Sequence, residues 1–392
     1  MTRTVAEHLR IVSAALPTAA GLGAEEIDVR SALHRITASD VVSPVDLPVF
    51  RNSQMDGFAV RAADVASVPV RMPVYGIVAA GDAPRDLPDG TTIKIMTGAP
   101  VPNGADCIVP VEDTVLGGAT VTINRGRSAG DFVREPGSDV RLGELLVPAG
   151  QKLGIQHIAA LAAAGIRTVR VRRRVHAAVI TTGAELVPAG TPLGPGQIFD
   201  SNSTALATGI LTNEAEVIAV KHCVDDPRQF LAMLRSVIKR VDVVFTSGGV
   251  SMGDFEVVRE ALTPLGGWFD HVGMQPGGPQ GLTILDGVPV ISFPGNPVST
   301  LISFQIFARP ALRALAGLPP VESETATLCS DVVSPRDKRQ YLRGRMTDAG
   351  VEVVSGPGSH LIAAMARADV LIEIPAEVTG LKAGSGVQVW PL

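Results

Sequence analysis

Apolar residues recur at helical spacing in two short stretches near the start of the chain. Val5, Leu9 and Val12 fall on one face of a helix over residues 4–16, and residues 22–35 show similar spacing. Both stretches are short and have a polar opposite face. We therefore expect two short helices that pack against neighbouring structure.

From Val42 to about Pro148 the apolar segments become shorter and are separated by proline and glycine. Such segments are typical of β-strands joined by turns. Helical spacing returns over residues 154–161, which predicts that the β-rich stretch is inserted into a helical domain. The predicted boundaries are residues 1–42 and 143–174 for a discontinuous helical domain, and residues 43–142 for the inserted β domain.

Strands and helices alternate regularly after residue 174. This alternation is typical of βαβ units and a parallel sheet. Pro297 suits the first turn of the last helix in this region, and Pro310 predicts a kink in it. We therefore expect a three-layer α/β domain over residues 175–318. Its strands are predicted at 175–180, 216–220, 241–245, 282–285 and 288–293, and its helices at 201–211, 227–239, from about 255, and at 297–316.

After Pro319-Pro320 the chain returns to short alternating segments, which predict a small C-terminal β domain of barrel-like form over residues 319–392. A chain of 392 residues exceeds one ordinary hydrophobic core, so several domains are expected. The predicted fold class is multidomain α/β plus β, with an inserted β domain and a discontinuous helical domain.

Composition and charge narrow the possible functions. With 46% apolar and 19% charged residues the chain is expected to fold into globular domains. A net charge of −5 gives no overall basic field, so we expect no nucleic-acid partner. The charged N-terminus and the lack of a long apolar run favour a cytoplasmic protein with no membrane association. The 3 cysteines are expected to be reduced thiols.

Three predicted strands end in segments rich in glycine and polar residues: 181–185, 246–254 and 294–297. Ligands of an open parallel sheet bind beyond the carboxyl ends of its strands. Glycine lets backbone N–H groups approach an anion, and a following helix N-terminus adds a favourable dipole. One such turn would be typical of an ordinary βα connection, but three at one edge predict a site for a phosphate-bearing ligand. None matches a dinucleotide-binding or Walker motif.

Carboxylates gather near the same predicted edge. Because Mg²⁺ commonly binds one or two carboxylates together with substrate phosphates, they favour a magnesium site. Asp200 and Asp226 also precede predicted helices, where capping explains them equally well. The histidines lack zinc-ligand spacing and no G-x-S-x-G elbow is present, which disfavours zinc and hydrolase chemistry. The carboxylates are Glu185, Asp200, Asp225, Asp226, Asp254 and Glu256.

The β-rich stretch has a second concentration of polar residues and turns, at Asn52–Ala59 and Met96–Pro102. Asp56-Gly57 by itself is typical of a hairpin turn.

Taken together, these motifs resemble the molybdopterin molybdenumtransferase family, which includes the C-terminal domain of gephyrin. They occur in the family's order and cover nearly the whole chain, whereas a lone Ser-Gly-Gly-Val would indicate only the wider molybdopterin-binding fold. The matching stretches are 52–59, 96–102, 104–106, 137–139, 182–186, 200–202, 247–253, 294–299, 358–360 and 368–369.

The resemblance implies an elongated homodimer whose active site lies between the α/β domain of one subunit and the β domain of the other. The implied substrates are adenylylated molybdopterin and molybdate, and the products are AMP and molybdenum cofactor, with Mg²⁺ assisting. The adenylyltransferase that makes the substrate and the apo-molybdoenzymes that receive the product are the further partners expected.

The resemblance also implies roles for individual residues. It implies catalytic roles for Asp56, Thr97, Asp139, Glu185 and Asp225; substrate binding by Ser247, Gly248, Gly249, Val250, Ser251, Gly253, Gln275, Pro294, Gly295, Asn296, Pro297 and Ser359; and metal binding by Glu185, Asp225 and Glu256.

The chain departs from the family at positions that concern anion binding. Many members have Lys-Pro-Gly-Lys-Pro where this chain has Gln275-Pro276-Gly277-Gly278-Pro279, so both ammonium groups are absent. Gln275 can still donate hydrogen bonds. Glu256 stands where Asp is usual, and Ala184 replaces an Asp.

These departures leave three hypotheses. The first is molybdate insertion. The second is a pterin-binding family member that has weakened or lost insertion activity and acts as a binding or scaffold protein. The third, disfavoured by the Asp56, Thr97 and C-terminal motifs, is an adenylyltransferase-type activity.

Overall fold

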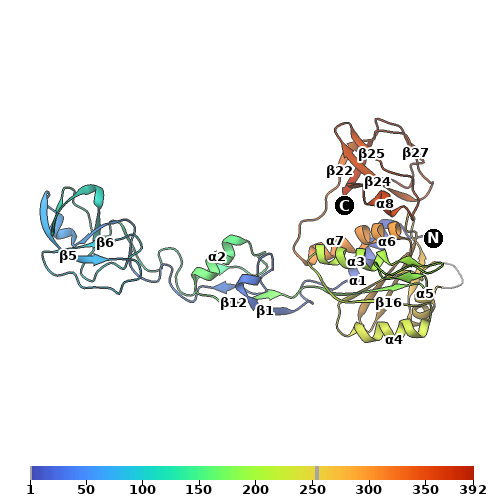
Figure 1. Cartoon of the computed structure of the whole chain (residues 1–392), viewed down its shortest axis with the longest axis horizontal. Helices are drawn as coiled ribbons and strands as arrows, with labels where there is room; N and C mark the ends of the chain where they lie inside the picture. Colours follow the sequence, from blue (N-terminus) through green and yellow to red (C-terminus); the bar gives the residue numbers. More distant parts are fainter. Residues whose placement is uncertain (1, 252–255) are drawn as a thin grey trace. The chain divides into compact units, whose positions relative to one another are not determined.

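The computed structural model describes residues 2–251 and 256–392 (Figure 1). The chain forms two compact units. The first comprises Met1–Gly23 together with Arg172–Leu392, and the second comprises Ala24–Val171. The predicted fold class, multidomain α/β plus β, is confirmed. Among the described residues, no helix is long and apolar enough to cross a membrane.

The second unit contains a six-stranded sheet in the order β7-β4-β6-β5-β9-β8. Alternation along strand β4 places Ala59 in one apolar cluster and Phe58 and Val60 in another, so this strand is buried on both faces. The short helical turns η2 (Ala62–Val65) and η3 (Val111–Asp113) join its strands. The strands are β4 (Gly57–Val60), β5 (Val70–Val78), β6 (Thr92–Ile95), β7 (Cys107–Pro110), β8 (Thr114–Gly117) and β9 (Thr120–Ile123).

The rest of the second unit surrounds a smaller apolar cluster that includes Val29 and Leu161. The predicted helix near residue 155 is confirmed as α2 (Ile155–Ala163). The predicted helix over residues 22–35 is wrong. This stretch forms a strand that pairs with a distant segment, followed by a 3₁₀ turn capped by Asp28, so its hydrogen bonds come from a partner that local spacing does not reveal. The elements are β1 (Ala24–Asp28), η1 (Val29–Ser31), β2 (Val41–Val42), β3 (Asn52–Ser53), β10 (Val133–Arg134), β11 (Leu145–Val147) and β12 (Thr168–Arg172).

A six-stranded sheet in the order β16-β13-β17-β21-β20-β18 forms the centre of the first unit. The first four strands are parallel, and β20 runs antiparallel to both of its neighbours, β21 and β18. The predicted parallel sheet is therefore present, and an antiparallel strand extends it. Asp286 and Gly287, both with positive φ, form a tight turn that can join only antiparallel strands. The strands are β13 (His176–Thr182), β16 (Glu216–Cys223), β17 (Val243–Ser247), β18 (Trp268–His271), β20 (Pro279–Leu285) and β21 (Val288–Phe293).

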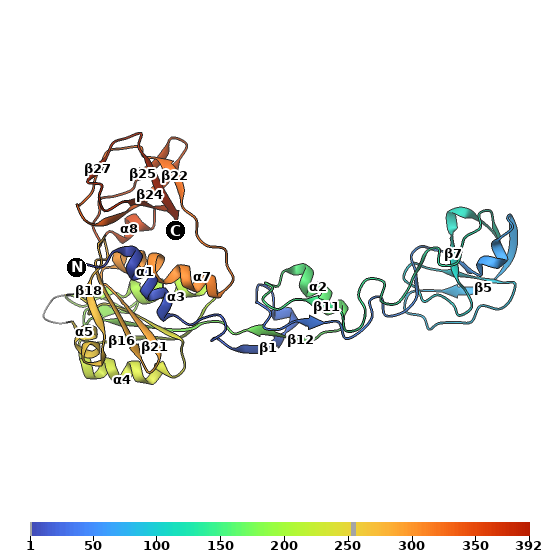
Figure 2. The ribbon, with the colours of Figure 1, turned by 180° about the vertical axis from the view of Figure 1, so that it is seen from behind.

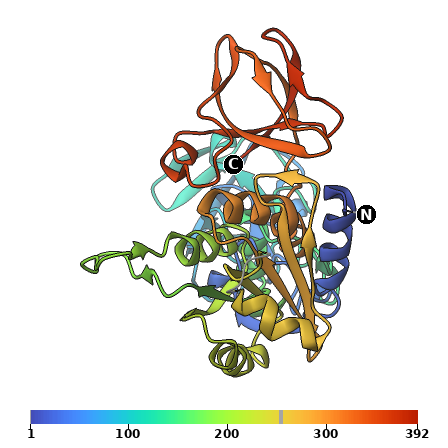
Figure 3. The ribbon, with the colours of Figure 1, turned by 90° about the vertical axis from the view of Figure 1, so that its right-hand side faces the viewer.

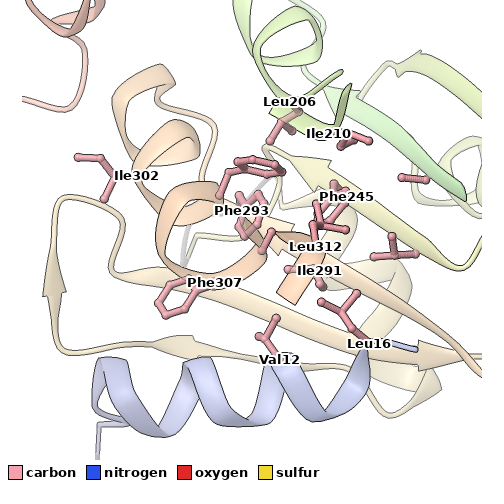
Figure 4. Packing of buried hydrophobic residues seen from close by; sticks show 14 of the residues in the cluster. Val12, Leu16, Leu206, Ile210, Phe245, Ile291, Phe293, Ile302, Phe307 and Leu312 are labelled. Atoms are coloured by element: carbon pink, nitrogen blue, oxygen red, sulfur yellow. The ribbon is translucent and has the colours of Figure 1, made fainter. Parts of the chain in front are cut away.

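Helices cover both faces of this sheet and complete three layers (Figures 1 and 2). On one face, Leu206 of α3 and Leu312 of α7 join strand residues such as Phe293 in a large apolar cluster (Figure 4). Phe230 of α4 and Val258 of α5 fill the cluster on the other face. The helices are α3 (Ser201–Thr212), α4 (Pro227–Ile238), α5 (Val257–Leu262), followed by the turn η4 (Thr263–Leu265), α6 (Pro297–Ser303) and α7 (Arg309–Leu315).

The N-terminal helix α1 (Val5–Ala15) packs on this α/β layer (Figure 4). Of the stretch 1–42 that was predicted for the discontinuous helical domain, residues 1–23 group with the α/β layer and residues 24–42 group with the second unit. Val12 and Leu16 lie in the same cluster as Phe307, and residues up to Gly23 group with the first unit.

The predicted last helix is present but interrupted. Phe304–Ala308 between α6 and α7 is π-helical. Pro310 has no N–H with which to continue the regular bonding pattern, which explains an irregularity at this point.

The C-terminal strands form a sheet in the order β19-β24-β26-β28-β22 beside helices α6 and α7 (Figure 3). Its strand β19 comes from the α/β region and pairs with β24, which brings Gln275 opposite Gln340. The remaining elements are β14 (Leu186–Val187), β15 (Ile198–Phe199), β19 (Met274–Gln275), β22 (Glu324–Thr327), β23 (Val332–Val333), β24 (Arg339–Thr347), β25 (Gly350–Val353), α8 (Ile362–Met365), β26 (Val370–Ile374), β27 (Gly380–Leu381) and β28 (Gly386–Pro391).

Candidate functional site

A cavity of about 750 Å³ opens at the carboxyl ends of β13, β17 and β21. This is the edge at which the glycine-rich segments were expected to meet. The predicted residues that line it are Glu185, Asp225, Ser247, Gly248, Gly249, Val250, Ser251, Glu256, Gln275, Pro294, Gly295, Asn296, Pro297 and Ser359. Gly253 and Asp254 lie outside the described residues.

The floor of the cavity is a contact between three backbone loops. Gly248 has φ +96°, and a Cβ there would lie 2.7 Å from the carbonyl oxygen of Thr182. A Cβ at Gly295 would lie 3.3 Å from the Cα of Gly248. Glycine is therefore required at position 248 both for the positive φ and for the close approach of the loops.

Asn202, in the first turn of α3, joins two of these loops. Its Nδ2 donates to Ser247 Oγ at 2.9 Å and to the carbonyl of Gly295 at 2.7 Å. Ser247 Oγ also lies 3.0 Å from Thr300 Oγ1 and donates to the Pro294 carbonyl at 3.2 Å. The Ser247 hydroxyl thus holds the loops together.

The acidic residues have different local functions. Asp200 accepts a hydrogen bond from Ser203 N, and Asp226 accepts one from Arg228 N. Both residues are therefore helix caps, which was one of the two roles expected from the sequence, beside magnesium binding. Within the cavity wall, Asp225 Oδ2 accepts from Ala184 N at 3.2 Å, and Glu256 Oε2 accepts from Ser251 N at 2.8 Å.

The lining residues that the structure describes include three carboxylates, Glu185, Asp225 and Glu256, and no lysine or arginine. No group of three or more acidic, histidine or cysteine side chains forms a ready-made metal site among the described residues. This arrangement fits Mg²⁺, which needs only one or two carboxylates when substrate phosphates and water complete its coordination.

Another part of the cavity wall is the loop that includes Gln275 of β19 and continues to Pro279. Gln340 Nε2 donates to Gln275 Oε1 at 2.8 Å, and the buried Gln280 donates to the Gly277 carbonyl at 2.7 Å. Gly278 contributes only backbone, with His271 as the nearest side chain to the position of its missing Cβ.

The C-terminal part of the chain closes another side of the cavity. Val298 N at the start of α6 donates to the carbonyl of Ser359 at 3.1 Å. Behind this segment, the fully buried Arg343 donates to Ser355 Oγ at 3.0 Å and to the Gly356 carbonyl. Arg343 and Asn202 were not among the predicted site residues. An arginine in a strand is usually a surface residue, so nothing in the sequence indicated that Arg343 is buried. The only sign for Asn202 was that it lies in one of the stretches that match the family.

Three predicted catalytic residues, Asp56, Thr97 and Asp139, belong to the second unit. Thr97 N and Thr97 Oγ1 both donate to Asp56 Oδ1, and these bonds lower the pKa of this exposed carboxyl. Asp139 is exposed, and its backbone N–H donates to the carbonyl of Leu47 at 2.9 Å.

The three-layer α/β domain with glycine-rich loops at the carboxyl edge of its sheet belongs to the class of molybdopterin-binding domains, because residues 178–314 match the family model described as a probable molybdopterin binding domain. Residues 3–165 match the MoeA N-terminal region (domain I and II), and residues 325–392 match the MoeA C-terminal region (domain IV). The chain belongs to the molybdopterin molybdenumtransferase family.

Relatives match along their full length. Molybdopterin molybdenumtransferase 2 of Mycobacterium tuberculosis is 40% identical over 406 residues, covering 100% of each chain. The molybdopterin molybdenumtransferase of Synechococcus elongatus is 36% identical and covers 94% of each chain. A solved structure of the molybdopterin biosynthesis moeA protein from Pyrococcus horikosii is 32% identical, with a TM-score of 0.82 over 100% of this chain and 99% of that chain.

Proposed function

We propose that this protein is a molybdopterin molybdenumtransferase, which inserts molybdate into adenylylated molybdopterin and releases AMP with the help of Mg²⁺. The observation that carries this proposal is the cavity itself. Three glycine-rich loops meet in backbone contact at its floor, and carboxylates stand at its rim. This combination suits a phosphorylated ligand that arrives with a divalent cation.

The backbone of Gly248, Gly249 and Gly295 would hold phosphate or pterin, because these residues line the cavity and carry no side chain between their backbone and a ligand. Glu185, Asp225 and Glu256 would hold Mg²⁺, which when bound neutralises phosphate charge beside the bond that releases AMP. The protein's own contribution is to position the dithiolene sulfurs and the molybdate and to exclude competing orientations.

In the proposed homodimer, the β domain of a second copy supplies Asp56, Thr97 and Asp139 to the cavity. The support for a role of Asp56 is geometric: both donors of Thr97 hold one oxygen of this exposed carboxylate, which keeps the group ionised and fixes its orientation at the surface. The adenylyltransferase and the apo-molybdoenzymes are the proposed donor and recipient of the pterin.

A second candidate function follows from one observation. Because the described lining residues include no lysine or arginine, the cavity has no cation of its own to attract free molybdate. A protein that binds the pterin and acts as a scaffold, with weakened insertion activity, would have such a cavity.

One assay separates the two candidates. Purified protein is incubated with adenylylated molybdopterin, Mg²⁺ and molybdate, and AMP and active cofactor are measured. The proposed enzyme releases AMP in proportion to molybdate. Tight pterin binding without molybdate-dependent AMP release would instead establish the scaffold. A matched reaction with free molybdopterin and ATP tests for adenylyltransferase activity, which we expect to be absent.

A further inference from the structure

The loop of residues 275–279 forms a wall of the cavity and carries no charged side chain. Its first residue, Gln275, is the member of this loop whose side chain has hydrogen-bond donors. A carboxamide can present either its oxygen or its NH₂ group to a ligand, and only the NH₂ group can bind an oxyanion. Which end faces the cavity therefore decides whether this wall attracts or repels an anion.

Gln340 settles the orientation of Gln275. The Nε2 of Gln340 donates to the Oε1 of Gln275 at 2.8 Å, so the Gln275 oxygen is already engaged. The two residues are also paired directly across strands β19 and β24. The NH₂ group of Gln275 is left as the end available to the cavity.

Burial fixes the orientation of Gln340 in turn. Gln340 is only 1% exposed, and its Oε1 has no hydrogen-bond partner. Turning the Gln340 amide over would move its NH₂ group to the buried position where Oε1 now has no partner, and both of its N–H donors would then lack an acceptor. An unsatisfied buried donor costs on the order of 1–3 kcal/mol, so the observed orientation is the favoured one.

A second buried glutamine holds the next turn of the loop. Gln280 Nε2 donates to the Gly277 carbonyl and to Ser303 Oγ, both at 2.7 Å. The loop is thus fixed from beneath at Gln275 and at Gly277, and its shape is established before a ligand arrives.

We propose that Gln340 is a positioning residue that makes Gln275 a neutral N–H donor for the oxyanion substrate of this cavity. The inference rests on the proposed function and adds to it the means of recognition. A neutral amide selects its ligand by hydrogen-bond geometry. Binding of the oxyanion at this wall should therefore depend less on ionic strength than binding to an ammonium group would.

The test reverses the direction of the Gln275 amide. In Gln340→Glu the buried side chain, when ionised, can only accept hydrogen bonds, so the NH₂ group of Gln275 turns toward it and the Gln275 oxygen faces the cavity. We expect the KM for molybdate to rise roughly tenfold or more at pH 8, while kcat at saturating molybdate stays close to that of the wild type.

The paired variant supplies a rescue. In Gln275→Lys/Gln340→Glu, the carboxylate becomes the partner of an ammonium group that can also contact the oxyanion. We expect the KM to return toward the wild-type value, and the salt dependence of KM to become steeper than in the wild type. Recovery in the double variant shows that residue 340 acts through residue 275.

Two further variants complete the design. Gln388→Glu places the same change on β28 of the same sheet, at an exposed position away from the cavity, and should leave the KM unchanged. Gln340→Leu removes the donor without adding charge, and should raise the KM for molybdate several-fold. This variant provides the test if Gln340→Glu does not fold. Folding of each variant is checked by tryptophan fluorescence.

A wild-type KM in folded Gln340→Glu and Gln340→Leu would overturn the inference, and so would a fall in kcat with unchanged KM. If the wild type shows no molybdate-dependent AMP release, the proposed function fails independently. Titration calorimetry of molybdate into the wild type and Gln340→Glu then tests the oxyanion site directly, and equal affinities would overturn the inference.

Discussion

Both the backbone amide and the hydroxyl of Thr97 donate to the same carboxylate oxygen of Asp56, at 2.7 and 2.8 Å. The backbone bond contributes most to lowering the pKa of Asp56, and the hydroxyl bond adds to it. Because the pKa is lowered in the folded protein, the carboxylate is present at neutral pH and is lost only as the pH falls through that lowered value. Asp56 is therefore suited to bind a cation or accept a hydrogen bond.

Asp56→Asn is expected to cut turnover by on the order of a hundredfold without changing stability, because it removes charge from an exposed residue. Thr97→Val removes the hydroxyl donor, raises the pKa of Asp56 and should move the acid limb of the pH–rate profile upward. Asp89→Asn, at a fully exposed position of the same unit, is the control. Wild-type turnover in Asp56→Asn would exclude a catalytic role.

The cavity carboxylates should set the requirement for Mg²⁺. Glu185→Gln and Asp225→Asn each remove one acidic ligand, so we expect the Mg²⁺ concentration for half-maximal AMP release to rise about tenfold. Glu260→Gln, on the exposed side of α5, is the matched control. EDTA should abolish AMP release in all variants. Unchanged Mg²⁺ dependence in both cavity variants would place the metal elsewhere.

Gly248→Ala should disrupt the floor of the cavity. Its Cβ would lie 2.7 Å from both the carbonyl and the hydroxyl oxygen of Thr182, at a φ of +96°. We expect a loss of more than about 2 kcal/mol in the free energy of unfolding, and loss of pterin binding.

The control for this substitution is Gly266→Ala, which also has a positive φ but has no atom within 4 Å of the added Cβ. Only the conformational cost of about 1 kcal/mol applies there. Urea denaturation followed by the fluorescence of Trp268 and Trp390, both in the first unit, measures the two variants. Equal losses would show that the contact with Thr182 is unimportant.

His8 should make the first unit sensitive to acid. Its ring lies between Trp268 and Phe307, with centroid distances of 5.2 and 4.7 Å, and neither ring nitrogen has a hydrogen-bond partner. Burial lowers the pKa of His8 to about 4, and the charge of Arg3 adds to the effect.

Between pH 6.5 and about 4 the unfolded chain therefore binds a proton that folded His8 does not. Stability should fall across this range as the pH is lowered, by up to about 3 kcal/mol. His8→Leu should reduce this pH dependence, whereas replacing the exposed His360 by Gln should not. The check is tryptophan fluorescence during denaturation at several pH values, and an unchanged slope in His8→Leu would refute the prediction.

The sequence predicted most elements whose stability is local. Helices such as α3 and α4 combine apolar periodicity with a capping aspartate, Asp200 or Asp226, within the same short stretch of chain. Strands β13 and β17 are continuous apolar runs, typical of a sheet buried on both faces. The glycine-rich strand ends were visible for the same reason, since positive φ and close approach leave glycine in the sequence.

Where the predictions were wrong, the deciding partner was distant in sequence. Residues 24–28 have helical spacing but pair as β1 with β12, and α1 docks on the α/β layer although it precedes the inserted segment. The resemblance, rather than residue spacing, supplied the roles of Asp56 and Thr97.

Local pattern therefore determined which stretches are helix or strand and which strand ends can bind an anion, because neighbours in sequence make those interactions. The tertiary structure alone decided that Asn202 ties two cavity loops together and that Arg343 holds Ser355 and Gly356, which precede Ser359 in the chain. It also placed Gln340 so that it turns Gln275 toward the cavity. Each of these relationships depends on hydrogen bonds between segments that only the packing of sheets and helices brings within reach, and no periodicity along the chain encodes such distances.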